Sequence, residues 1–252
     1  MTAPPQTLAA ALAAIRERMA RAAEHAGRDP ATVALIAVTK TQPLARIAEA
    51  AALGVRDFGE NRVQEALAKF APPDDAATET VTPDGADLIP RSGLTLHLIG
   101  TLQRNKARRA AGFFDTIQSV DRIDLLTDLE RHRAADAVTC PPLPVLIEVN
   151  ISGEAAKTGA APADVPALAD ALRGCPHLAP HGLMTIAAPG LDEVALRRQF
   201  AAVRELRDRL QVAHPDVAWS ELSMGMSDDF EVAIQEGATM VRLGRALFGA
   251  RR

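Results

Sequence analysis

The sequence predicts an α/β protein that forms one (β/α)8 barrel over residues 1–252. Apolar runs typical of buried parallel strands alternate with helical stretches along nearly the whole chain. The length of 252 residues matches the roughly 250 residues of such a barrel. The first apolar run leads into Thr39, Lys40 and Thr41, without the glycine-rich fingerprint of a doubly wound sheet. A closed barrel is therefore favoured over an open sheet.

An extra helix precedes the first strand. Residues 8–26 are alanine-rich, with Ile15 and Met19 one turn apart, and Gly27 and Pro30 end the helix. Residues 33–38 form the first strand, and a helix follows from Pro43 to about residue 53. Later strands are expected at residues 55–58, 96–99, 144–151, 221–223 and 240–243, while residues 116–117 lie in the fourth strand and residues 182–184 close the sixth. Later helices are expected at residues 62–70, 121–135, 165–172, 192–212 and 228–236, with a last one from Arg245.

Residues 71–95 interrupt this alternation. The stretch contains Pro72, Pro73, Pro83 and Pro90 and few apolar residues. We expect a flexible surface insertion between a helix and the third strand, and no linker to a second domain.

Composition excludes several classes of protein. Apolar residues make up 48% of the chain, which is enough for a sizeable core. The net charge is −4, and the lysines and arginines are scattered along the sequence, so neither a nucleic-acid-binding face nor an acidic tail is predicted. The N-terminus lacks the features of a signal peptide, and no apolar run approaches the ~20 residues of a membrane span. A cytoplasmic location is expected. Cys140 and Cys175 are interpreted as reduced thiols, and His177 and His181 lack a third metal ligand at suitable spacing.

Lys40 is the strongest candidate for chemistry, because active sites of such barrels lie where strands end. A lysine that directly follows a buried strand is partly desolvated, which favours the neutral, nucleophilic amine of Schiff-base chemistry. The alternative is a lysine that merely extends from the barrel mouth into solvent. Position alone does not decide between the two.

The segments after the seventh and eighth strands predict a phosphate site. Ser223 offers a hydroxyl, Arg242 a positive charge, and Gly225 and Gly244 allow close approach of backbone N–H groups. The helix starting at Arg245 would direct its N-terminus towards the anion. The alternative is that the glycines only make tight turns. Met224 is interpreted as a packing residue that lines the pocket. A reactive amine beside an anion cradle suits a phosphorylated aldehyde.

Other candidates are less specific. His97 is a candidate cofactor-binding residue, but it stands within an apolar run, where a hydrogen-bonded core histidine is the more common outcome. The basic run Arg104, Lys106, Arg108 and Arg109 indicates a solvated helix face, or a surface for an anionic partner. The chain contains no tyrosine, which excludes any mechanism that needs a tyrosine of this chain.

These segments together resemble the pyridoxal phosphate homeostasis proteins. The matches run from about residue 8 to 251, without the insertion. They comprise Ala37-Val38-Thr39-Lys40 with Gln42-Pro43, Phe58-Gly59-Glu60-Asn61 with Val63-Gln64-Glu65, His97, Ile99-Gly100, Leu102-Gln103, Asn105-Lys106, Val149-Asn150, Lys157, Gly159, Gly182-Leu183-Met184, Leu222 to Asp228, Val241-Arg242, Gly244 and Phe248-Gly249. The chain departs from the family pattern at Arg62, where an aromatic residue is common, at Thr101 for proline and at Arg104 for serine.

The resemblance implies a barrel of the alanine racemase N-terminal type, without that enzyme's second domain. It implies pyridoxal 5′-phosphate (PLP) held as a Schiff base on Lys40, with phosphate contacts from Ser223, Arg242, Gly244 and Arg245, and with Asn61 nearby. It also implies a carrier or regulator of PLP and of amino-acid balance, with no catalytic residues. The expected partners are PLP and, as candidate recipients, PLP-dependent apoenzymes, and the expected state is a monomer.

Two alternatives remain. A racemase needs two opposed bases, usually a lysine and a tyrosine, so this chain would have to use His97 or a partner chain. A cofactor-free scaffold would act through the basic run at residues 104–109. The carrier hypothesis has a corollary: a cation such as Arg242 near the pyridine nitrogen keeps it unprotonated, which makes the ring a poor electron sink.

Overall fold

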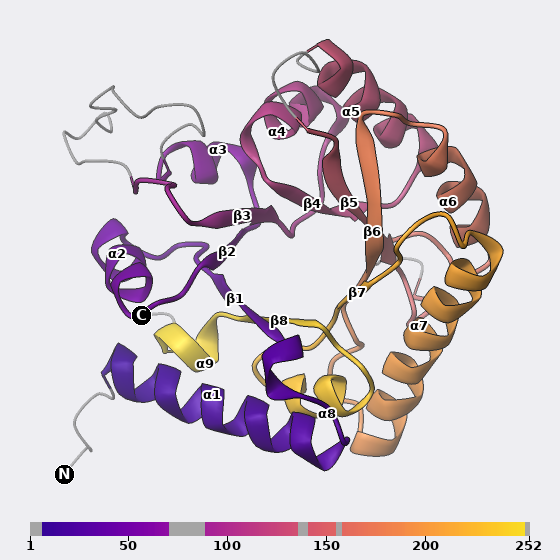
Figure 1. Cartoon of the computed structure of the whole chain (residues 1–252). Coiled ribbons are helices and arrows are strands. Elements are labelled where there is room, and N and C mark those ends of the chain that lie inside the picture. The colour runs from indigo at the N-terminus through magenta and orange to yellow at the C-terminus, as the bar shows by residue number, and fades with distance from the viewer. Residues whose placement is uncertain (1–6, 71–88, 136–140, 155–157, 250–252) are drawn as a thin grey trace.

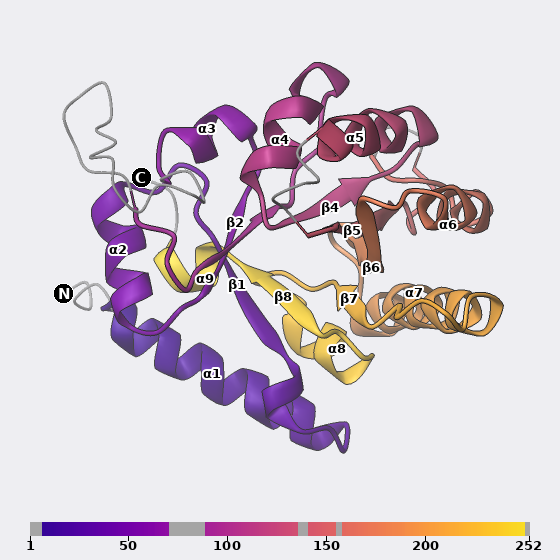
Figure 2. The ribbon, with the colours of Figure 1, turned by 45° about the horizontal axis from the view of Figure 1, so that its top comes forward.

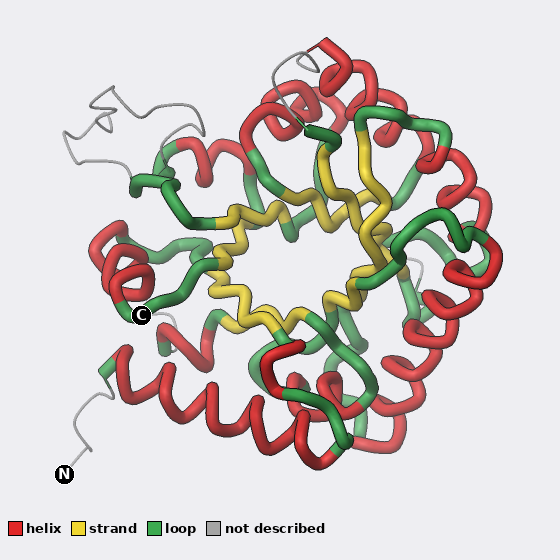
Figure 3. The backbone as a smooth tube through the Cα atoms, in the orientation of Figure 1, coloured by secondary structure: helices red, strands yellow, loops and turns green. Residues whose placement is uncertain are grey.

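The computed structural model describes residues 7–70, 89–135, 141–154 and 158–249. In these residues, eight parallel strands form a closed barrel in the order β1 to β8, with helices packed around it (Figures 1 and 3). The strands are β1 Ala34–Val38, β2 Asp57–Glu60, β3 Thr95–Leu98, β4 Thr116–Val120, β5 Leu143–Val149, β6 Leu178–Thr185, β7 Glu221–Ser223 and β8 Met240–Leu243. The helices are α1 Leu8–His25, α2 Leu44–Ala52, α3 Val63–Leu67, α4 Ala107–Phe113, α5 Ile123–Ala135, α6 Val165–Arg173, α7 Glu193–Ala213, α8 Phe230–Gln235 and α9 Arg245–Phe248, with 3-10 turns η1 Pro30–Thr32 and η2 Arg104–Lys106. The predicted barrel with an N-terminal helix is confirmed.

Most strands differ by a residue or two from the sequence-based bounds, and three of them, β2, β4 and β6, contain residues that the sequence pattern alone does not assign to a strand. β2 runs two residues later than expected, because Glu60 finds buried partners and can remain in the strand. β4 continues through Gln118 and Ser119, which are polar yet fully buried. β6, which is expected to close with residues 182–184, runs from Leu178 to Thr185, and its pairing with β5 shifts register beside Pro180 and Gly182, which absorbs the proline.

Helix α1 covers the outside of the barrel next to α8 and α9 (Figures 1 and 2). Its N-terminus is capped by Thr7, whose hydroxyl accepts from the N–H of Ala10 at 3.2 Å. Leu8, Leu12, Ile15 and Met19 bury one face of the helix. Arg18 of α1 also donates to Glu231 of α8 at 2.7 Å, so apolar packing and an ion pair hold the same contact.

The predicted insertion is described only from residue 89 onwards, since residues 71–88 lie outside the described residues. Ile89 and Arg91 are buried, so this last part packs on the barrel and is not a surface loop as predicted. Arg91 donates to the carbonyl of Phe113 and pairs with Asp115. The reason is visible only in three dimensions, because these partners follow far later in the chain.

No helix in the described ranges is long and apolar enough to span a membrane.

Gly182 of β6 lies where the barrel backbone is tightest. A Cβ at this position would lie 1.9 Å from the carbonyl oxygen of Glu221 in β7. We expect Gly182→Ala to lower the free energy of unfolding by about 2–3 kcal/mol, since the backbones must separate. Urea unfolding would measure it. Gly174→Ala is the control, because its Cβ would lie 3.3 Å from the nearest atom and its φ is −75°. Equal losses in both variants would contradict the steric argument.

Candidate functional site

The candidate residues converge at the carboxyl ends of neighbouring strands. Lys40 follows β1, Asn61 follows β2, and Gly244 follows β8. Because β1 pairs with β2 on one side and β8 on the other, these three positions are adjacent although the chain separates them widely. Ser223 ends β7, the next strand along. The barrel thus brings the predicted lysine and the predicted anion loops to one face.

The backbone on both sides of Lys40 is fixed by hydrogen bonds. Thr39 is buried; its N–H donates to Gly59 O at 3.0 Å, and its hydroxyl donates to Glu60 Oε1 at 2.7 Å. Thr41 adopts a left-handed conformation with φ of 62°, and its N–H donates to Glu65. A non-glycine residue holds such a conformation only where surrounding contacts enforce it. The half-buried side chain of Lys40 therefore starts from a defined backbone.

Lys69 joins these contacts into one ion cluster. Its ammonium donates to Thr39 O at 2.7 Å, Glu60 Oε1 at 2.9 Å and Glu65 Oε1 at 2.6 Å, which uses all three of its donor positions. Sequence reasoning missed this residue, because its signal is only a lysine at the end of a predicted helix. Lys69 orders the segment that carries Lys40.

The two carboxyl groups of this cluster have opposite pKa shifts. Burial raises the pKa of Glu60 above its ordinary value, although bonds from Lys69 and Thr39 oppose this. Burial would also raise the pKa of Glu65, but bonds from Lys69 and the Thr41 N–H outweigh it and lower the pKa. Glu65 therefore gives up its proton more readily than Glu60, although both carboxyl groups accept from Lys69.

Arg242 lies inside the barrel and is almost completely buried. Its guanidinium donates to Ser223 O at 2.7 Å, to Ser223 Oγ at 2.8 Å and to Thr185 O at 2.7 Å. Burial lowers its pKa to about 10, although the nearby carboxyl groups of Asp229 and Glu148 act in the opposite direction. Arg242 thus remains a cation at neutral pH and is held by three acceptors.

A directed chain of hydrogen bonds continues from Arg242 across the barrel. Ser223 Oγ donates to Gln118 Oε1 at 2.6 Å, and Gln118 Nε2 lies 3.0 Å from His97 Nδ1. His97 Nε2 lies 3.0 Å from Asp57 Oδ1. Because a carboxylate only accepts, the hydrogen of His97 lies on Nε2, and every donor then points from the cation towards Asp57.

This chain of hydrogen bonds involves two of the predicted site residues, His97 and Ser223. His97 has the arrangement of a hydrogen-bonded core histidine and reaches Ser223 only through Gln118. The hydroxyl hydrogen of Ser223 is used inside the barrel. Sequence reasoning did not identify Gln118 as a site residue. The only indication in the sequence is an amide side chain between the apolar residues Ile117 and Val120.

Glu148 of β5 is a second polar group in the interior. It is paired in register with Met184, which is itself paired with Ser223. Its Oε1 accepts from Thr158 at 2.6 Å, whereas Oε2 has no partner among the described residues. Burial raises its pKa, with a further contribution from Asp121, although the bond from Thr158 and the charge of Arg242 act in the opposite direction. An orphaned buried oxygen is a position where a bound molecule could supply the missing partner.

The segments after β7 and β8 pack closely on their neighbours. Gly225 has φ of 94°, and a Cβ there would lie 2.6 Å from Ala233 Cβ, so only glycine fits. Its carbonyl accepts from Arg242 N–H at 3.0 Å, which ties the two segments together. A Cβ on Gly244 would lie 3.4 Å from Val38 Cβ, so this glycine lies against the end of β1. The anion loops are therefore positioned directly beside the segment of Lys40.

Met224 and Arg245, the two remaining predicted residues near these loops, lie in different surroundings. Met224 is fully buried in the core. Arg245, the first residue of α9, is exposed, and its guanidinium pairs with Asp228. The N–H of Ala246 is capped by Ser227 Oγ at 3.0 Å.

The weaker metal candidates do not form a site in the described residues, where no three His, Cys, Asp or Glu side chains gather suitably. His177 instead contacts Glu130 at 2.6 Å. Cys140 and Lys157 lie outside the described residues.

Known proteins provide an independent comparison. Residues 10–252 match the model of the alanine racemase N-terminal domain. The chain is 47% identical over 245 residues to the pyridoxal phosphate homeostasis protein of Pseudomonas aeruginosa, covering 97% of this chain and 96% of that protein. It superposes on PipY of Synechococcus elongatus with PLP bound, with a TM-score of 0.76 and 36% identity, over 96% of this chain and 100% of that one. Alanine racemase of Clostridium difficile shares the fold at 14% identity, with a TM-score of 0.65, over 95% of this chain and 56% of that one.

Gln118 should be essential for the stability of the barrel interior. Gln118→Met has a similar shape but leaves Ser223 Oγ and His97 Nδ1 without their partner. We expect the free energy of unfolding to fall by about 2–3 kcal/mol, measured by urea denaturation. Gln103→Met, at an exposed position, serves as the control and should change it by less than about 0.5 kcal/mol. An unchanged free energy of unfolding in Gln118→Met would show that these hydrogen bonds contribute nothing to stability.

Glu65 should give the fold a pH dependence. Because its pKa is lowered in the folded chain, its carboxylate stabilises the fold above its ordinary pKa of 4.5, and this contribution is lost as the pH falls through the folded pKa. Glu65→Gln should therefore lose about 1 kcal/mol of unfolding free energy at pH 7, and the difference from the parent should shrink below about pH 4.5. Glu49→Gln, which removes an exposed partner of Arg46, is the control. A difference that does not vary with pH would refute the assignment.

Proposed function

The chain belongs to the pyridoxal phosphate homeostasis proteins, and from that premise we propose that it binds PLP covalently through Lys40 and buffers or delivers it. The observation that carries this proposal is the placement of Lys40. Its segment is fixed by the Lys69 cluster and lies beside the loops that end β7 and β8. When bound, the aldehyde of PLP would condense with the lysine amine and release water.

The residues present fit the phosphate of this cofactor. Phosphates bind readily to backbone N–H groups of glycine-rich turns and first helical turns. The proposed contacts come from the segments of Ser223, Met224 and Gly225 and from Gly244 and Arg245. Because the Ser223 hydroxyl donates to Gln118 and the Arg245 guanidinium pairs with Asp228, we propose that their backbone groups serve the phosphate. Asn61, after β2, would lie on the opposite side of Lys40.

We propose that the chain holds the cofactor without running a metabolic reaction. Arg242 is a buried cation in the barrel interior, and a cation at the pyridine nitrogen would keep that nitrogen unprotonated. The chain has no tyrosine to act as an opposed base. His97, the substitute that the sequence offered, has both ring nitrogens engaged by Asp57 and Gln118. These contacts favour a carrier over a racemase.

PLP-dependent apoenzymes as recipients, an effect on amino-acid balance, a monomeric state and a cytoplasmic location belong to the same proposal. Each rests on the sequence and on the family.

The decisive test is the visible absorption spectrum of the purified chain with PLP. The parent should show the band of lysine-bound PLP, and Lys40→Ala should lose it, since the bond needs this amine. Borohydride reduction and mass spectrometry should locate the adduct on Lys40. Lys106→Ala, which removes another lysine near the barrel mouth, is the control and should keep the band. A band that persists in Lys40→Ala would assign the cofactor to another lysine, and no band in the parent would refute the proposal.

A further inference from the structure

A polar cleft of about 510 Å³ opens beside the proposed PLP site. One wall is the segment that leads from β2 into α3, and the other is the segment between β3 and α4. Its lining consists of Asn61, Arg62, Val63, Gln64, Leu98, Gly100, Thr101, Leu102, Gln103 and Lys106. Apart from Asn61, the proposed function uses none of these residues.

The floor of the cleft is built rigidly. A Cβ on Gly100 would lie 2.4 Å from the carbonyl oxygen of Asn61, so only glycine lets the two segments meet. The N–H of Ile99 donates to Glu60 O at 3.0 Å, and Arg122 donates to Leu102 O at 3.1 Å. These contacts fix the backbone of both walls, so a ligand would enter a preformed site.

The charge of the cleft is positive. Arg62 and Lys106 come from opposite walls, and the lining contains no carboxyl group. No ion-pair partner is found for either cation in the ranges that the structure describes. Glu65, which is close in sequence to Arg62, accepts from Lys69 and from the Thr41 N–H, and the charge of Arg62 makes the smallest contribution to lowering its pKa.

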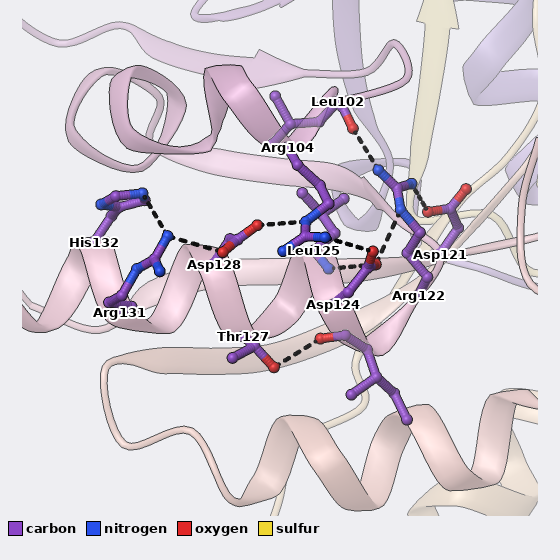
Figure 4. A network of polar contacts seen from close by, with 11 residues as sticks. Leu102, Arg104, Asp121, Arg122, Asp124, Leu125, Thr127, Asp128, Arg131 and His132 are labelled. Carbon is purple, nitrogen blue, oxygen red and sulfur yellow. Dashed lines mark hydrogen bonds and ion pairs between the residues drawn. The ribbon is translucent and has the colours of Figure 1, made fainter.

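Two neighbouring cations, Arg104 and Arg122, have ion-pair partners. Arg104 is bound by Asp128 at 2.6 Å and Asp124 at 3.3 Å, and Arg122 by Asp121 at 2.5 Å (Figure 4). The basic run that the sequence shows is therefore split. Two carboxylates of α5 pair with Arg104, whereas no ion pair to Lys106 is found among the described residues.

The cleft offers the chemistry that a phosphate monoester requires. Such a group carries about −1.5 to −2 charges at pH 7 and three acceptor oxygens. Arg62 and Lys106 match the charge, and the amides of Gln64 and Gln103 and the hydroxyl of Thr101 supply neutral donors. We propose that this cleft is a second site, which binds a small organic phosphate other than the molecule held on Lys40.

Titration calorimetry at low ionic strength tests the proposal with two probes, glycerol 3-phosphate and inorganic phosphate. The full chain is first loaded with PLP and reduced, so that the Lys40 site is blocked. We expect one further binding event, weakened about tenfold by Arg62→Gln and by Lys106→Gln, because each removes one charged contact. Arg104→Gln, the adjacent but paired cation, should change the affinity less than twofold.

Four outcomes would overturn the proposal: no binding of glycerol 3-phosphate, binding of inorganic phosphate alone, no effect of Arg62→Gln or Lys106→Gln, or an equal effect of Arg104→Gln. Melting temperatures without phosphate would reveal a variant that fails to fold. In that case Arg62→Lys and Lys106→Arg, which keep the charge, should bind like the parent. If PLP cannot be fixed on Lys40, the same titration of the unloaded chain still tests the cleft, because these variants lie outside the Lys40 site.

Discussion

The pairing of β1 with β8 closes the sheet, and the remainder of the site depends on that closure. It places Ile36 opposite Arg242, and it brings Gly244 against Val38 at the end of β1. A lysine near the start of the chain and glycine loops near its end thereby become neighbours. An open sheet made of the same strands would leave these groups at opposite edges. α1 supports the closure from outside by packing on α8 and α9, next to the seam.

Closure also creates an interior in which polar groups must find partners. Arg242 cannot reach water, so it donates to Ser223 and Thr185, and the chain through Gln118 and His97 satisfies each following group. The low dielectric makes such a network costly to break and strong when complete. Residues that resemble ligand contacts in the sequence therefore hold the barrel together. This is why the proposed phosphate contacts rest on backbone groups more than on side chains.

Two regions of the mouth use charge in opposite ways. Around Lys40, the ammonium of Lys69 donates to Thr39, Glu60 and Glu65, and these three bonds order the segment that carries Lys40. In the adjacent cleft, Arg62 and Lys106 have no acidic neighbour in its lining. A charge that is already paired orders the protein, whereas one without a counter-ion attracts a ligand.

The sequence by itself determined the barrel, the N-terminal helix, the family, and the positions of Lys40 and the glycine loops, because period and strand-end location are local properties. It placed the end of β4 too early, because Gln118 looks unlike a strand residue. It could not show that Arg91 is buried, that Ser223 donates inwards, or that Arg104 has ion-pair partners whereas Lys106 has none among the described residues. Those facts are decided by partners far away in the chain, and only the tertiary structure brings them within bonding distance.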